Sequence, residues 1–237
     1  MSEWVPNLPH LEEREEINMN YNFSIIRKGI ILVEAESQYA LCSMFLRPQE
    51  YYESPYKNIC GKYFTLEEYM DTYANDRGAF TYYTDWCGFN IPSEVFVNFV
   101  NLFQFTFNTK ENLLVNGIRN LIPNLEGKFY IIGVCKGKWN KETLDHETAH
   151  ALWYLDPVYR DKMSSLLYNK VRLYLYEKAK ISLESVGYDK KVINDELHAY
   201  IATASRKKIL RLFGWGKDER VSTSIRKYFK EYCASHK

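Results

Sequence analysis

Apolar and polar residues follow two different periods along this chain, and each period predicts a different kind of element. Residues 22–34 contain two isoleucine-rich runs on either side of Lys28-Gly29, and residues 128–135 form a third apolar run after Gly127. Apolar runs bounded by turn residues are typical of β-strands, and the first two predict a hairpin. The strands are therefore expected in the N-terminal half of the chain.

Helical periodicity occurs in both halves and fills the second. Thr65 and Glu68 have the spacing of a capping box, which predicts a helix that ends before Gly78. Asp156 and Pro157 predict another helix start, an N-cap followed by proline at the first helical position. The other predicted helices cover residues 93–103, 110–121, 141–155, 157–185, 190–204 and 222–233.

Three segments are expected to be irregular. Residues 1–20 are a polar, partly helical arm, and residues 47–60 contain two prolines and are expected to be a loop. Residues 82–92 are aromatic but loop-like, and such a segment either lines a substrate cleft or packs over a core. Residues 39–46 fit a short helix or a strand.

Length and composition place the chain among ordinary globular proteins. Its 237 residues suffice for one domain with a sizeable core. The order of the predicted elements gives an α+β fold, with a small N-terminal sheet and a mainly helical C-terminal half. We expect residues 1–237 to form a single domain.

The net charge of +1 conceals an uneven distribution of charge. The first sixteen residues hold five glutamates and one arginine, whereas residues 206–237 hold ten Lys/Arg and three Asp/Glu, a net charge of +7. A basic C-terminal segment of this kind can contact nucleic acid or another acidic partner. The alternative is a solvated basic helix that balances acidity elsewhere.

Cysteine usage and the N-terminus bear on the compartment. The five cysteines are odd in number and include no C-x-x-C pair, so they indicate neither a disulfide framework nor a cysteine zinc site. The first residues lack the basic start and apolar core of a signal peptide, and no apolar run reaches the length of a membrane span. A cytoplasmic protein with no membrane partner is expected.

One predicted helix carries the sequence His-Glu-x-x-His, formed by His146, Glu147 and His150. Two histidines four residues apart lie on one helical face, so both imidazoles can reach one metal ion. Zinc bound in this way lowers the pKa of its water to about 7, and a neighbouring carboxylate can then act as general base. The alternative is a buried helix with two hydrogen-bonded core histidines.

With Thr143 three residues before the first histidine and uncharged residues between the two, this helix resembles the active-site helix of the zincin metallopeptidases. The resemblance covers residues 143–152. It implies a zincin-like fold, one Zn²⁺ per chain and hydrolysis of a peptide or protein substrate with Glu147 as general base. It also implies that the strand at residues 128–135 forms the rim of the substrate cleft, whereas an interior strand is the alternative.

A catalytic zinc site needs a third protein ligand, and three residues compete for that position. Glu196 lies at the edge of an apolar helical stripe, where a carboxylate must be paired, protonated or bound to metal. In the gluzincin branch of the zincins a glutamate from a downstream helix completes the site, so the resemblance favours Glu196. Asp156 stands where metzincins place their third ligand, but Trp153 replaces the glycine of that pattern. His198, expected nearer the polar face of its helix, is the remaining candidate.

Peptide hydrolysis also needs a donor to the oxyanion of the tetrahedral intermediate. Tyr200 lies one turn beyond Glu196 and is a candidate, as are His198 and Tyr154. Each of these residues is equally compatible with a place in the core.

The sequence therefore predicts a zinc-dependent metallohydrolase, a peptidase of gluzincin type, with His146, His150 and Glu196 as metal ligands and Glu147 as general base. Two other functions remain open. One is a zincin-like hydrolase that acts on a non-peptide amide or ester. The other is a binding protein whose basic C-terminal segment contacts nucleic acid. The sequence does not indicate an oligomeric state.

Overall fold

The computed structural model describes residues 21–86, 88–185, 188, 190–216 and 220–236. Within these residues a four-stranded sheet has the order β1-β2-β4-β3. The strands are β1 (Tyr21–Arg27), β2 (Ile30–Ala35), β3 (Gly88–Pro92) and β4 (Tyr130–Cys135). β1 and β2 form the expected antiparallel hairpin, β2 pairs in parallel with β4, and β3 is an antiparallel edge strand on the other side of β4.

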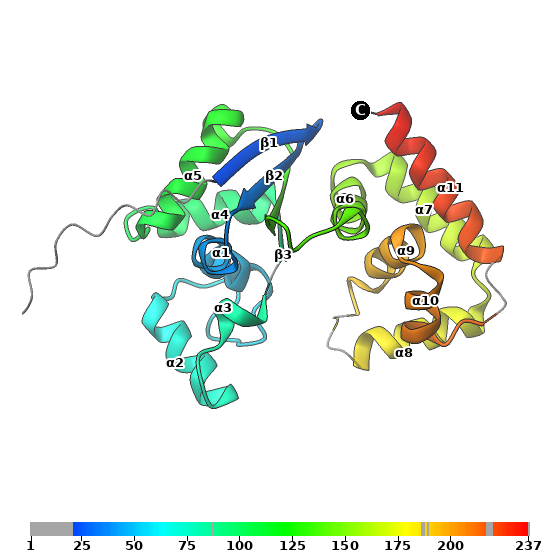
Figure 1. The fold of residues 1–237 in the computed structure, drawn as a ribbon, viewed down its shortest axis with the longest axis horizontal. Helices are drawn as coiled ribbons and strands as arrows, with labels where there is room; N and C mark the ends of the chain where they lie inside the picture. Colours follow the sequence, from blue (N-terminus) through cyan, green and yellow to red (C-terminus); the bar gives the residue numbers. More distant parts are fainter. Residues whose placement is uncertain (1–20, 87, 186–187, 189, 217–219, 237) are drawn as a thin grey trace, which may run out of the picture.

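The helices form two groups along the chain (Figure 1). The described helices of the N-terminal half are α1 (Gln38–Glu53), α2 (Leu66–Arg77), α3 (Tyr82–Asp85), α4 (Ser93–Phe103) and α5 (Thr109–Leu121), with a short 3₁₀ turn at Pro123–Leu125. Those of the C-terminal half are α6 (Lys141–Leu155), α7 (Pro157–Lys170), α8 (Leu173–Ser185), α9 (Ile193–Thr203), α10 (Arg206–Phe213) and α11 (Arg220–Ser235). The fold is α+β, as expected, and mostly helical.

Each face of the sheet belongs to a different hydrophobic core. On β2 and β4, Ile31 and Ile131 face the core formed with α1, α4 and α5, whereas Leu32 and Ile132 face the core formed with the C-terminal helices. This alternation follows from the two-residue period of a strand. Because both faces are covered, all six residues of β4 are buried.

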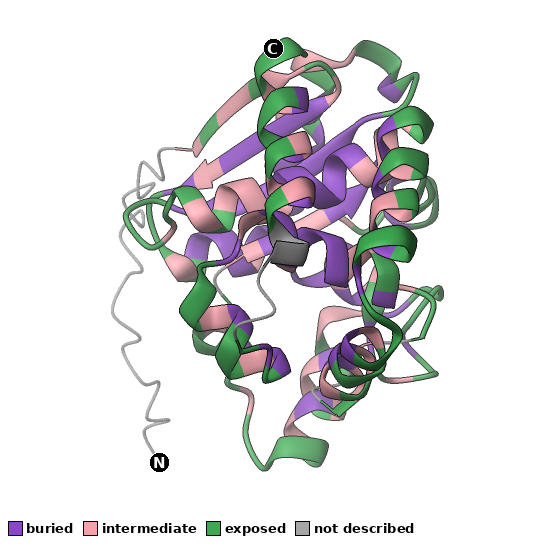
Figure 2. Cartoon of the chain, turned by 90° about the vertical axis from the view of Figure 1, so that its right-hand side faces the viewer, coloured by how far each residue is buried: buried purple, intermediate pink, exposed green. Residues whose placement is uncertain are grey.

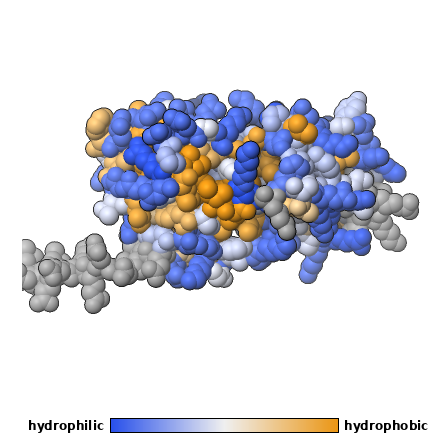
Figure 3. Space-filling model, turned by 90° about the horizontal axis from the view of Figure 1, so that it is seen from above, coloured by the Kyte–Doolittle hydropathy of each residue, from blue (hydrophilic) through white to orange (hydrophobic). Residues whose placement is uncertain are grey.

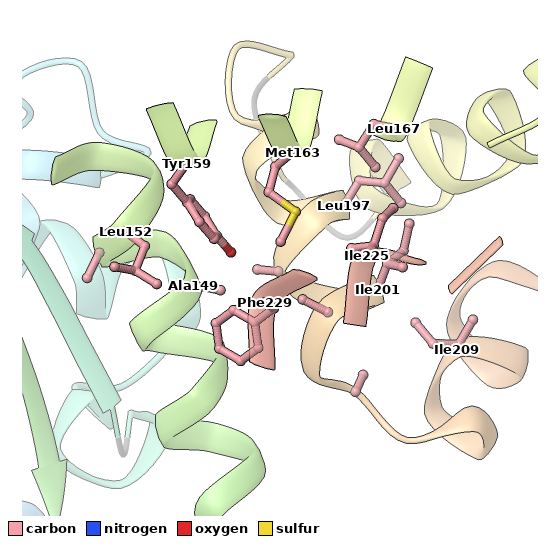
Figure 4. Close-up of a cluster of buried hydrophobic side chains, with 14 of the residues drawn as sticks. Ala149, Leu152, Tyr159, Met163, Leu167, Leu197, Ile201, Ile209, Ile225 and Phe229 are labelled. Carbon is pink, nitrogen blue, oxygen red and sulfur yellow. The ribbon is translucent and has the colours of Figure 1, made fainter. Parts of the chain in front are cut away.

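The C-terminal core packs helices of the second half of the chain around α9 (Figure 4). Leu197 and Ile201 of α9 pack among buried side chains from α6, α7 and α11, which include Ala149, Leu152, Tyr159, Met163, Ile225 and Phe229. The outward faces of these helices are exposed and their inward faces are buried (Figure 2). α9 is therefore held firmly against α6, the helix that carries both motif histidines.

Seen from above, the molecule is mainly hydrophilic, with an apolar area over the N-terminal half (Figure 3). No helix among the described residues is both long and apolar enough to cross a bilayer.

Several local predictions are confirmed. Thr65 and Glu68 form a capping box, and Gly78 follows the helix in the left-handed conformation. Asp156 caps α7 by accepting from the backbone N–H groups of Val158 and Tyr159.

The predicted helix over residues 157–185 is interrupted at Val171, between α7 and α8. The predicted arm at residues 1–20 lies outside the described residues.

Two of the predicted loops contain regular structure. Residues 47–53 are not a loop, because α1 continues through Pro48 to Glu53. Burial of Met44, Phe45 and neighbouring apolar residues outweighs the roughly 3 kcal/mol that an internal proline costs. Residues 82–92 contain the short helix α3 and the strand β3.

The prediction that the strand at residues 128–135 forms the rim of a cleft was wrong. β4 lies between β2 and β3, so it is an interior strand, and β3 is one of the two edge strands of the described sheet. α1 crosses β4 at close range, because a Cβ at Gly133 would lie 2.7 Å from Cζ of Phe45. The sheet edge nearest to the motif helix is therefore β3.

Candidate metal centre

Helix α6 brings the two motif histidines together. It begins at an N-cap, Asn140, whose side chain accepts from the backbone N–H of Thr143 at 3.0 Å, and it runs without interruption to Leu155. The Nε2 atoms of His146 and His150 lie 3.2 Å apart. Both rings therefore point toward one place beside the helix.

Helix α9 adds the carboxylate of Glu196 to this pair. Its Oε2 lies 3.8 Å from Nε2 of His146, and its Oε1 lies 3.5 Å from Nε2 of His150. One ligand atom from each of the three residues lies within 4.8 Å of the others. In a tetrahedral zinc site the metal lies about 2.0–2.2 Å from each ligand atom, so two ligand atoms are roughly 3.3–3.5 Å apart. The spacing of the three groups therefore fits zinc with little movement.

The surroundings of the three groups also suit a cation. Oε2 of Glu196 is buried and has no hydrogen-bond partner among the described residues, which is costly for a carboxylate oxygen unless it binds something. Asp195 Oδ1 lies 2.9 Å from Nδ1 of His150, and Thr203 Oγ1 lies 3.5 Å from Nδ1 of His146. An oxygen atom beside each Nδ1, with each Nε2 directed toward the shared place, is the arrangement usual for zinc-bound histidines.

Electrostatic coupling in the metal-free protein is strong. Burial and the neighbouring His150 hold the pKa of His146 well below its usual value. Burial alone would lower the pKa of His150, but the charges of Asp195 and Glu196 raise it to about 10. Burial raises the pKa of Glu196 to about 7, although the positive charge of His150 lowers it. The negative charges of Asp195 and Glu147 raise the pKa further. His150 therefore carries a positive charge that a bound metal ion would replace.

Glu147 points from α6 toward the sheet. Its Oε2 accepts a hydrogen bond from Nδ2 of Asn90 in β3 at 3.0 Å. Oδ1 of the same asparagine accepts from the hydroxyl of Tyr130 in β4 at 2.9 Å. Burial raises the pKa of Glu147, although His150 and the hydrogen bond from Asn90 oppose this effect. A carboxylate with a raised pKa beside a metal site is suited to accept a proton.

The competing third ligands have other partners. Both carboxylate oxygens of Asp156 are hydrogen-bonded, Oδ1 to the start of α7 and Oδ2 to the hydroxyl of Tyr232. Asp156 is not part of the group of potential ligands, which consists of His146, His150 and Glu196 among the described residues. Its position is therefore explained by its role as an N-cap.

The structure places His198 in the core, whereas the helical pattern predicted a position nearer the polar face. Its side chain is fully buried and stacks on Trp153, with ring centroids 4.5 Å apart. Nδ1 of His198 lies 2.5 Å from the backbone oxygen of Asp195 and 3.3 Å from Oδ1 of the same residue. His198 therefore contacts the carboxylate that supports His150.

The tyrosines predicted as oxyanion donors occupy different places. The ring of Tyr200 packs on His146, with centroids 4.6 Å apart, and its hydroxyl lies 3.4 Å from that of Tyr188. The hydroxyl of Tyr154 lies 3.1 Å from Oγ of Ser93, at the start of α4. Tyr200 therefore borders the histidines, whereas the hydroxyl of Tyr154 is engaged at the contact between α6 and α4.

Several residues at the site were missed by sequence reasoning. Asn90 was hidden in a segment predicted to be a loop, although the alternation of buried Phe89 and Ile91 around it is typical of a strand. Tyr188 lies outside every predicted element. Glu53, at the end of α1, is open to solvent, yet surrounding protein raises its pKa to about 7 and the charges of His150 and Glu147 act on it. No sequence signal placed Glu53 near the motif helix.

Part of the basic C-terminal segment is used inside the molecule. The guanidinium of Arg226 donates to the backbone oxygens of Ile201 and Ala204 at 2.9 and 2.6 Å. Lys208 lies 3.6 Å from Glu142, on the motif helix. These two cations therefore connect the segment to α9 and α6.

Comparisons of the chain with protein-family models, curated proteins and solved structures gave no match.

Proposed function

We propose that the protein is a zinc-dependent hydrolase of the gluzincin type that cleaves peptide bonds. The observation that carries this proposal is the convergence of His146, His150 and Glu196 within 4.8 Å, with Glu147 beside them. A glutamate from a helix downstream of the His-Glu-x-x-His helix is the third ligand expected for a gluzincin. The long segment between the two helices consists of α7 and α8.

His146, His150 and Glu196 would hold one zinc ion, which, when bound, lowers the pKa of a water molecule and polarises a carbonyl group. Glu147 would accept a proton from water and would donate it to the leaving amine. Asp195 keeps the ring of His150 in the orientation that directs Nε2 to the site. Tyr200, whose ring packs on His146, would donate its hydroxyl hydrogen to the developing oxyanion.

A peptide substrate is favoured over another amide or an ester by the position of β3. Among the residues that the structure describes, this edge strand pairs with β4 on one side only, and Asn90 connects it to Glu147. An extended peptide can add to a free strand edge through main-chain hydrogen bonds, which need little sequence specificity. The edge therefore offers a means to hold a peptide chain beside the general base.

Zinc content tests the metal centre. Protein purified without chelator should contain about one zinc per chain, as expected for a single three-ligand site. A His146→Ala, His150→Ala double variant should contain none. No zinc in the purified protein, and no uptake on titration, would refute the proposed function.

The hydrolytic reaction is tested by Glu147→Gln, which keeps the size of the side chain but cannot accept the proton. This variant should retain zinc and lose nearly all cleavage of a mixed peptide library followed by mass spectrometry. Glu142→Gln is the matched control, because Glu142 lies on the same helix and pairs with Lys208. Normal cleavage by the Glu147 variant would require a different general base.

A further inference from the structure

Three side chains from three elements form a hydrogen-bonded row that ends at Glu147. Tyr130 of β4 donates to Oδ1 of Asn90 in β3, and Nδ2 of Asn90 donates to Oε2 of Glu147 on α6, with distances of 2.9 and 3.0 Å. Tyr130 is 4% exposed. No hydrogen bond to Oε1 of Glu147 is present among the described residues, so one carboxylate oxygen is held and the other is free.

The register of the sheet determines that these side chains meet. Asn90 pairs with Ile132, and Tyr130 pairs with Pro92, so Asn90 and Tyr130 are diagonal neighbours on one face of the sheet. Phe89 and Ile91 point to the opposite face, into the N-terminal core. A shift of one residue in β3 would turn Asn90 away from α6.

The chemistry of the row fixes the orientation of its central amide. The amide oxygen of Asn90 cannot face the carboxylate of Glu147 without repulsion, so Nδ2 must point to Glu147. Oδ1 then points to Tyr130, and the phenol must be the donor. Burial holds the pKa of Tyr130 well above its usual value, so the phenol keeps its proton at neutral pH. The hydrogen bond from Tyr130 to Asn90 and the one from Asn90 to Glu147 therefore require the same orientation of the amide.

We infer that Asn90 and Tyr130 are positioning residues for the proposed hydrolysis, acting through Glu147. They restrain Oε2 so that Oε1 is the oxygen that takes the proton from water. A glutamate side chain has three rotatable bonds, and proton transfer requires the acceptor within hydrogen-bond reach. This role rests on the proposed function, and it explains why a polar residue occupies the centre of β3.

A double-mutant cycle tests this role, with a peptide that the wild type cleaves as the substrate. Asn90→Ala should lower kcat by about 10–100-fold, the range for loss of an outer-shell partner, while zinc affinity is unchanged. In a Glu147→Gln background the same substitution should have no further effect, because the group that it positions is already disabled. Asn22→Ala is the matched control, since Asn22 donates to Glu34 at 3.2 Å in a strand pair away from the site.

Tyr130→Phe provides a second variant and a measurement that does not depend on activity. In metal-free protein labelled with ¹⁵N at asparagine, the side-chain NH₂ of Asn90 should exchange slowly with solvent. In Tyr130→Phe this exchange should become faster, because the amide loses the bond that fixes its orientation. Tyr159→Phe is the control, since the buried hydroxyl of Tyr159 has no hydrogen-bond partner among the described residues.

The outcomes separate this inference from the proposed function. If the wild type binds zinc and cleaves peptide, but Asn90→Ala lowers kcat equally with and without Glu147, Asn90 does not act through Glu147 and the inference is overturned. An unchanged kcat in Asn90→Ala, or unchanged amide exchange in Tyr130→Phe, overturns it as well. A wild type that takes up no zinc overturns the proposed function, and this role with it.

Discussion

At the scale of single residues, Asp195 shows how strongly the site depends on groups that do not touch the metal position. Its carboxylate lies between two histidines, 2.9 Å from Nδ1 of His150 and 3.3 Å from Nδ1 of His198. Burial opposes ionisation, but the charge and hydrogen bonding of the two histidines lower the pKa of Asp195 to about 2. Asp195 is therefore ionised at neutral pH and fixes the ring of His150.

Asp195→Asn should weaken zinc binding by about 10–100-fold, because an amide orients the imidazole less strongly than a carboxylate. Competition with a chromogenic chelator measures the affinity. Asp161→Asn, at an exposed position on α7, is the control and should bind zinc as the wild type does. Unchanged affinity in Asp195→Asn would show that His150 is oriented by packing alone.

The proton on metal-free His150 makes zinc binding dependent on pH. Because its pKa is raised to about 10, zinc must displace one proton throughout the neutral range, so affinity should rise about tenfold per pH unit. Below pH 7 protonation of Glu196, whose pKa is about 7, should make the dependence steeper. Titration calorimetry in buffers of different ionisation enthalpy counts the protons. Equal affinity at pH 6 and pH 8 would contradict this prediction.

At the scale of elements, the joint between α6 and α7 explains why the residue after the motif helix is an aspartate. Oδ1 of Asp156 accepts from two N–H groups of α7, and Oδ2 accepts from the hydroxyl of Tyr232 in α11. Partial burial works to raise the pKa of Asp156, but these hydrogen bonds outweigh it and lower the pKa. The carboxylate therefore connects three helices of the C-terminal half.

Asp156→Ala should lower the free energy of unfolding by about 1 kcal/mol through loss of the cap, with zinc affinity unchanged. Because the pKa is lowered in the folded state, the stabilisation is complete above the unfolded pKa of about 3.9 and disappears as the pH falls. Urea unfolding at pH 7 and pH 3 should therefore show a larger difference between variant and wild type at pH 7 than at pH 3. Loss of zinc in this variant would make Asp156 a ligand and Glu196 a bystander.

At the scale of the whole molecule, the candidate metal centre lies where the two cores meet. The sheet separates the cores, β3 and α6 face each other at its edge, and α9 reaches the site from the C-terminal core. Glu196 belongs to α9, a helix held by α6 and α11 (Figures 1 and 4). A metal ion at this place would connect two helices that are far apart in the sequence.

Zinc should therefore stabilise the folded protein as a whole. With free zinc at about 100 times its Kd, the free energy of unfolding should rise by about 2.7 kcal/mol. Thermal unfolding with and without chelator measures this rise as a higher Tm. Glu196→Ala should abolish the zinc-dependent part and retain the fold by circular dichroism, whereas Glu177→Ala, at an exposed position of α8, should keep it. A full zinc response in Glu196→Ala would exclude it as a ligand.

Features that depend on neighbouring residues in the chain could be predicted from the amino-acid sequence. The hairpin around Lys28-Gly29, the capping box at Thr65 and the cap at Asp156 are short-range signals, and the structure contains each of them. The facing of His146 and His150 follows from helical geometry alone.

Features that depend on packing between distant segments could not be predicted from local patterns. Helix α1 passes through Pro48 because burial against the sheet outweighs the local cost, and β3 exists because β4 lies beside it. His198 is buried because α9 is surrounded by helices on more sides than its apolar stripe indicated. Asn90 reaches Glu147 across 57 residues of chain, and no local pattern encodes a contact of that kind. The chemical groups of the site can therefore be identified from local patterns, whereas the packing of distant segments decides which of these groups meet.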